Sequence, residues 1–153
     1  MWENYVEEAA IELVTALARD LEPEQLTRPR VREFIEEGAS VWDLSVHPGW
    51  RQLWVKRVTA LAKGGDGGNW GLNTANARNT RKLFAAVGID PLPAEHAERL
   101  DQLVALRGEI VHTATTTSGI YKREVGDWQE FVRELYESVD AKARQQCKNW
   151  LTS

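Results

Sequence analysis

Residues 100–113 read LDQLVALRGEIVHT, a stretch that combines a helical pattern with two side chains of chemical interest. One face of this expected helix, about 120° wide, carries Leu103, Val104, Arg107, Ile110 and Val111. Arg107 lies in the middle of that apolar stripe. Because arginine is seldom buried without a partner, its position requires an anion. Either a carboxylate such as Glu3 or Glu109 pairs with it, or an anionic ligand enters beside it.

The same three- and four-residue spacing of apolar positions extends along most of the chain. It predicts helices over residues 2–21, 29–37, 50–63, 74–87 and 94–114, and a last helix after residue 127. We expect Thr27 to precede the second helix, Asn73 or Thr74 to cap the fourth, Gly88 to end it, and Asp127 to cap the last. In no segment do apolar and polar residues alternate with the period of two that is typical of a β-strand. The sequence therefore predicts an all-α bundle, and 153 residues suit a single domain over residues 1–153.

Composition excludes several classes of protein. No apolar run approaches the roughly 20 residues of a membrane span, and the start, MWENYVEEAA, is acidic where a signal peptide is basic. The single cysteine, Cys147, allows no internal disulfide, and we expect it half-buried in a cytoplasmic protein. His47, His96 and His112 are too scattered for a metal site, and the Gly64–Gly68 loop lacks a P-loop ending. We expect neither a metal nor a cofactor.

Charge is unevenly distributed along the chain. The formal net charge is −4, yet residues 44–89 hold seven Lys and Arg residues against one Asp, a net charge of +6, which leaves −10 for the rest. Such a region attracts a phosphate backbone, although an ordinary solvated face looks the same in sequence. The candidate RNA contacts are Arg51, Lys56, Arg57, Arg78, Arg81 and Lys82. Trp50, Trp54 and Trp70 lie in the same region, where Trp50 and Trp54 fit a core better than stacking on bases.

The run from Arg107 to His112 matches the Arg-x4–6-His motif of HEPN domains, and the chain resembles the RiboL-PSP-HEPN and related endoribonuclease groups. Residues 2–5, WENY, resemble the first helix of that family, while residues 79–84 and 88–90 resemble the helix and glycine turn before the motif. The resemblance covers most of the chain. It implies an up-and-down bundle of about five to six helices, a homodimer with the motif helices facing each other, and metal-independent RNA cleavage that leaves a 2′,3′-cyclic phosphate.

The resemblance also implies roles for individual residues. His112 is the expected general acid or base, because an imidazole exchanges protons near neutral pH. Arg107 is expected to hold the phosphate, for which a planar guanidinium is well suited. Glu3 is a candidate to orient either group, and Thr113 is a candidate hydrogen-bond donor. Helix spacing adds that Gly108, four residues before His112, lies on the same face and leaves space beside the imidazole.

The sequence leaves two further functions open. Active members of the family usually carry a polar residue directly after the arginine, where this chain has Gly108. That departure favours a catalytically silent HEPN module that binds RNA, a nucleotide or a protein partner. A DNA-binding helix-turn-helix over residues 24–60 lacks a recognition-helix pattern. The leading hypothesis remains an endoribonuclease of a bacterial defence or toxin–antitoxin system. Its possible partners are a neutralising antitoxin that inhibits it or a larger defence protein to which it is joined.

Overall fold

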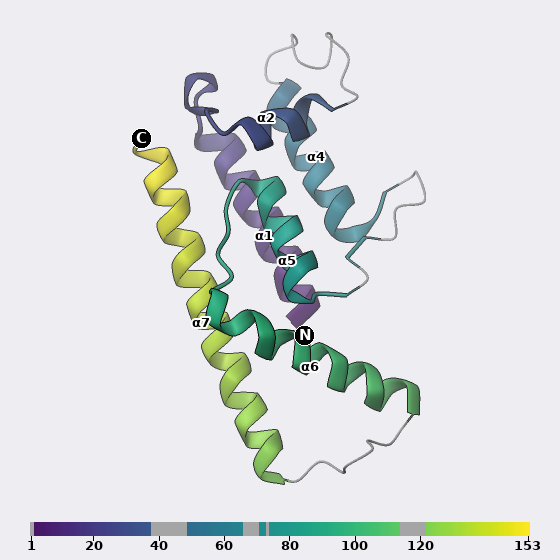
Figure 1. Ribbon diagram of the computed structural model, residues 1–153. Coiled ribbons are helices and arrows are strands. Elements are labelled where there is room, and N and C mark those ends of the chain that lie inside the picture. The colour runs from purple at the N-terminus through teal and green to yellow at the C-terminus, as the bar shows by residue number, and fades with distance from the viewer. Residues whose placement is uncertain (1, 38–48, 66–70, 73, 114–121) are drawn as a thin grey trace.

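The computed structural model describes residues 2–37, 49–65, 71–72, 74–113 and 122–153, without the side chains of residues 112, 113, 122 and 123. In these ranges the chain forms α-helices, one short 3-10 helix and no strand, so the all-α expectation is confirmed. The elements, shown in Figure 1, are α1 (Trp2–Asp20), η1 (Pro23–Gln25), α2 (Pro29–Glu36), α4 (Gly49–Lys63), α5 (Ala77–Val87), α6 (Ala94–Thr113) and α7 (Lys122–Leu151). None of these helices has the length and apolar character needed to span a bilayer.

Helix α1 lies at the centre of the bundle, in contact with α4, α5 and α7. In Figure 1, α7 runs along one side of the bundle, α2 crosses its top and α6 crosses its lower end. The buried residues of α1 recur at helical spacing, as the sequence predicts: Val6, Ala10, Val14 and Leu17. From α7 the core receives Phe131, Leu135, Val139 and Trp150. Burial of each large apolar side chain contributes about 1.5–3 kcal/mol to stability, so this shared core holds the helices together.

Two tryptophans, Trp54 and Trp150, fix the ends of helices through their indole N–H groups. Trp54 is fully buried and donates to the Ala86 carbonyl over 2.8 Å. Trp150 donates to the Gln25 carbonyl over 2.9 Å, and its ring lies 6.0 Å from that of Trp54. The preference for Trp54 as a core residue is therefore confirmed, Trp50 is partly buried, and Trp70 lies outside the described residues.

The ends of several helices differ from the sequence-based expectations. Helix α5 is capped by Asn76, whose side chain accepts from the Asn79 amide over 2.9 Å, so the expectation of Asn73 or Thr74 was wrong. Helix α2 follows Arg28 instead of Thr27. Helix α7 begins at Lys122, five residues before the expected cap, and Asp127 lies within it. Asp127 does not act as a cap because the residues before it continue the helix.

Gly88 ends α5, as predicted. Its φ of +92° lies in the left-handed region, which glycine adopts without strain. A Cβ at this position would lie 2.7 Å from both the Trp150 ring and the Val31 side chain. Gly88 therefore serves two purposes, since it terminates the helix and lets α7 and α2 pack closely against the turn.

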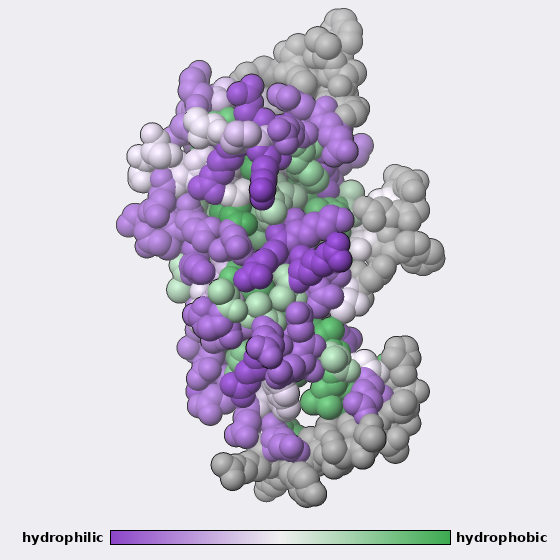
Figure 2. Space-filling view, in the orientation of Figure 1, coloured by the Kyte–Doolittle hydropathy of each residue, from purple (hydrophilic) through white to green (hydrophobic). Residues whose placement is uncertain are grey.

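Helix α6 is anchored at its N-terminal half and becomes more exposed towards its C-terminal end. Leu100 is fully buried, and the Asp101 carboxylate accepts from the Ala77 amide over 2.7 Å. Further along, the exposed fraction rises to 38% at Ile110 and 69% at Val111. Figure 2 shows hydrophobic atoms at the surface in the region of α6. The apolar face predicted for this helix is thus only partly covered by the described residues.

Candidate functional site

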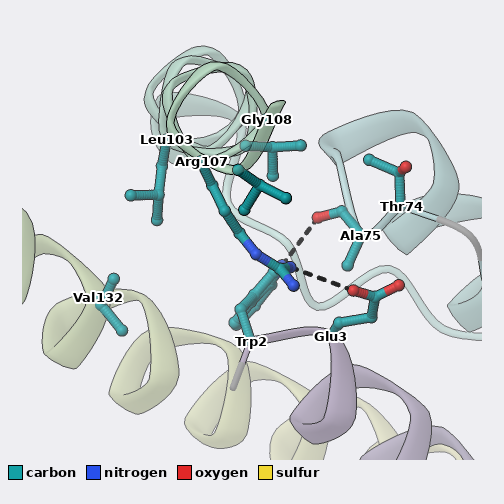
Figure 3. Close-up of a pocket in the computed structure, with 10 residues that line it drawn as sticks. Trp2, Glu3, Thr74, Ala75, Leu103, Arg107, Gly108 and Val132 are labelled. Atoms are coloured by element: carbon teal, nitrogen blue, oxygen red, sulfur yellow. Dashed lines mark hydrogen bonds and ion pairs between the residues drawn. The ribbon is translucent and has the colours of Figure 1, made fainter. Parts of the chain in front are cut away.

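Arg107 is paired with the carboxylate of Glu3, which lies in the first turn of α1. Its Nη1 lies 3.2 Å from Oε2 of Glu3, and Figure 3 shows the guanidinium reaching from α6 towards α1. The Arg107 side chain is 67% exposed and that of Glu3 is 23% exposed. Of the partners expected from the sequence, Glu3 is the one the structure provides. Among the described residues, Glu3 engages one of the five guanidinium N–H donors of Arg107, so donors remain for an anion from solvent.

Beside this pair lies a pocket of about 510 Å³, a size typical of sites for small ligands. Two charged side chains, Glu3 and Arg107, line it together with Thr74 and Gly108. Its other walls are apolar and come from α1, α6, α7 and the segment before α5: Trp2, Ala75, Leu103, Val104, Val111 and Val132. The pocket therefore combines apolar walls with an ion pair, an arrangement that suits an amphipathic ligand.

Trp2 forms a rigid wall of the pocket. Its Nε1–H donates to the Ala75 carbonyl over 2.9 Å, which fastens the start of α1 to the segment before α5 (Figure 3). Its ring also lies 5.5 Å from the rings of both Tyr5 and Tyr136. These contacts fix the first turn of α1, and with it the position of Glu3 opposite Arg107.

Gly108 leaves room on the side of α6 that lines the pocket. A Cβ built at this glycine meets no atom within 4 Å among the described residues. The helix therefore carries a glycine, at a cost of about 0.8–1 kcal/mol relative to alanine, for which the described residues give no packing reason. The free space is available to a ligand or to another chain.

His112 belongs to the last turn of α6, but its side chain and that of Thr113 lie outside the described residues. The structure consequently places Arg107 and Glu3 together and leaves the relation of Arg107 to His112 as a prediction. The expected hydrogen bond from Thr113 is a prediction for the same reason.

The six candidate RNA contacts divide into two groups, and none of them lines this pocket. Arg51 donates to the Leu21 carbonyl over 2.8 Å, Arg57 donates to the Phe34 carbonyl over 2.7 Å, and Arg81 lies 3.7 Å from Asp90. These three bind other parts of the protein. Lys56, Arg78 and Lys82 are exposed and form no ion pair within the described part of the chain. Of the six candidates, these three are the ones that could meet a phosphate backbone without giving up a contact to another described residue.

Two other features bear on the chemistry of the chain. Cys147 is half-buried, as expected, and burial raises the pKa of its thiol. Among the described residues, no three His, Cys, Asp or Glu side chains come together in a group that suits a metal ion.

Comparison with known proteins adds no assignment. No family model, no curated protein and no solved structure matches the chain. The geometry around Arg107 is therefore the basis for assigning a function.

The walls formed by Thr74, Ala75 and Val132 were not anticipated from the sequence. They come from segments far apart in the chain, and no local pattern marks them. The one sequence feature that pointed to this pocket was Trp2, a large aromatic residue directly before the acidic Glu3.

Proposed function

We propose that the protein is a HEPN endoribonuclease that cleaves RNA without a metal ion, with Arg107 and His112 of α6 as its catalytic pair. The observation that carries this proposal is the position of Arg107. Its guanidinium is oriented by Glu3, lines a pocket and is largely open to solvent. A guanidinium fixed in this way binds a phosphate and stabilises the charge that develops on its oxygens.

In the proposed reaction, the ribose 2′ oxygen attacks the adjacent phosphorus, and the bond from phosphorus to the 5′ oxygen of the next nucleotide breaks. The proton of the 2′-hydroxyl passes to a base, and the departing 5′ oxygen takes up a proton. Imidazoles suit both transfers because they titrate near neutral pH. His112 fills this role, and the products are a 2′,3′-cyclic phosphate and a free 5′-hydroxyl.

A second copy of the chain completes the proposed site. On an ideal helix, positions 107 and 112 face different directions, since five residues rotate the chain well past a full turn. The exposed Ile110 and Val111, together with the open space at Gly108, support contact between the C-terminal halves of two α6 helices. In that arrangement both copies contribute an arginine and a histidine to one cleft of a HEPN-like dimer.

The exposed cations of α4 and α5 extend the proposed RNA contact. Lys56, Arg78 and Lys82 attract the phosphate backbone, and this attraction weakens as salt is added. We place the enzyme in a bacterial cytoplasmic defence or toxin–antitoxin system, where a neutralising antitoxin or a larger defence protein controls it.

A silent HEPN module is the second candidate, and one observation favours it. Arg107 already has an anionic partner in Glu3, and Gly108 supplies no polar group next to it. A site of this kind binds RNA, a nucleotide or a protein partner through the remaining donors of Arg107 without cleaving a bond.

The two candidates separate in a cleavage assay with labelled RNA in EDTA. The enzyme is expected to cut RNA, whereas Arg107→Ala and His112→Ala variants are expected to lose at least about 100-fold in rate. Arg133→Ala is a matched control, because Arg133 is also 67% exposed and pairs with a carboxylate, that of Glu130, at 3.4 Å. RNA binding without products would favour the silent module.

The dimer has a separate test in light scattering. The protomer has a mass of 17.3 kDa, so the proposal predicts about twice that value at working concentrations. Val111→Lys should shift the protein to a single protomer, since it places a charge in the proposed interface. A wild-type mass equal to that of one protomer would contradict the dimer.

A further inference from the structure

The pocket beside Arg107 has a second charged wall that phosphate binding does not use. Arg107 occupies one oxygen of Glu3, but a carboxylate offers about four acceptor positions. Glu3 is largely buried, and it reaches this pocket from the side opposite α6 (Figure 3). Within the described part of the chain, the pocket therefore presents Glu3 acceptors that Arg107 does not use.

These features define the ligand by its chemistry. The apolar side chains of Leu103, Val104 and Val132 are able to pack against the face of a planar ring. A fatty acid fits less well, because it carries no N–H donor for the Glu3 carboxylate. The ligand must bring N–H donors to the Glu3 carboxylate and an acceptor or anion to the Arg107 guanidinium.

We propose that this pocket binds a guanine base, with its N1–H and N2–H groups donating to Glu3 and the attached phosphate at Arg107. Guanine is the one common base whose Watson–Crick edge places two N–H donors side by side. Adenine and cytosine offer one amino group there, and uracil offers one imide N–H. A carboxylate with free acceptors therefore selects guanine by hydrogen bonding.

The inference rests on the proposed function for its phosphate contact, and it names the nucleotide at which the same site acts. Guanine recognition through Glu3 makes the enzyme selective for RNA with an unpaired G, because a paired guanine has its Watson–Crick edge occupied. A free guanine nucleotide offers the same base and phosphate, so the test includes both sources.

Calorimetry on the full chain provides the first measurement. We expect GMP to bind at least about tenfold more tightly than AMP, CMP or UMP. The pentanucleotide UUGUU should exceed UUAUU by a similar factor if RNA is the source. A preference for GMP without a preference for UUGUU would identify the free nucleotide as the ligand. Equal affinity for all four mononucleotides would overturn the inference.

Two variants test whether the preference for GMP arises in this pocket. Glu3→Gln replaces an acceptor with an amino group and should abolish the preference for GMP, whereas a preference that survives would contradict the proposal. Gly108→Leu fills the pocket and should abolish GMP binding. Gly126→Leu in α7 is its matched control, since a Cβ at Gly126 also meets no atom within 4 Å. Melting temperatures confirm that each variant is folded.

The cleavage assay separates this inference from the proposed function. Cutting in EDTA with no preference for G would refute guanine recognition and leave the ribonuclease in place. Selective guanine binding with no cutting would support the inference and refute the ribonuclease.

Discussion

Replacing Gly108 with alanine should stabilise the isolated protomer by about 0.5–1 kcal/mol. Glycine inside a helix costs about 0.8–1 kcal/mol relative to alanine, and a Cβ at Gly108 meets no atom within 4 Å. No steric cost offsets the gain within the described residues. For a chain of 153 residues, unfolding entropy of about 2.1 cal/mol/K per residue converts this into a rise of about 2–3 °C in Tm.

The assay is thermal and urea unfolding over a range of protein concentrations. Gly126→Ala is the matched control, with equal clearance in α7 but nearer to a helix start, so its gain should be smaller. If a second copy packs against Gly108, the gain should shrink as the dimer becomes populated. A Gly108→Ala protomer less stable than wild type at low concentration would refute the reasoning, because it would mean that this position is crowded within one chain.

The core and the titratable groups give three further predictions. Trp54→Phe should lower the free energy of unfolding by about 2–3 kcal/mol in urea titrations, because it removes a buried hydrogen bond to Ala86 and leaves a cavity. Burial, assisted by the charge of Asp140, raises the pKa of Tyr5 to about 12. The folded protein keeps this proton where the unfolded chain loses it near pH 10, so urea midpoints should fall between about pH 10 and 12 and hold steady just below. Burial raises the pKa of the Cys147 thiol, so iodoacetamide at pH 8 should alkylate the folded protein more slowly than the urea-unfolded chain, and equal rates would contradict this.

Local pattern was sufficient to predict most helices. The stripe through Val6, Ala10 and Val14 is buried at helical spacing, and Gly88 ends α5 in the conformation that its glycine suggests. Helix ends were harder to predict. Asp127 and Asn73 are good caps in isolation, yet α7 continues through the former and α5 uses Asn76. Several residues with equal capping ability compete within a few positions, and tertiary packing decides between them.

The candidate site was only partly predictable. A helical wheel places Arg107 on the apolar face of α6, and a carboxylate partner follows from the cost of leaving its charge alone. The wheel does not show where the helix leaves the bundle, so the exposure of Val111 was not foreseen. The pocket walls depend on Trp2 contacting Ala75, residues 73 positions apart, and no local pattern specifies that contact.

The most direct test of the proposed chemistry is an analysis of the RNA ends produced in EDTA. We expect fragments ending in a 2′,3′-cyclic phosphate, because the ribose 2′ oxygen is the proposed nucleophile. We also expect that a 2′-deoxy substitution at the cut nucleotide blocks cleavage, and that Arg107→Ala yields no fragments where Arg133→Ala does. Cleavage of the 2′-deoxy substrate, or cleavage that EDTA abolishes, would contradict the proposed chemistry.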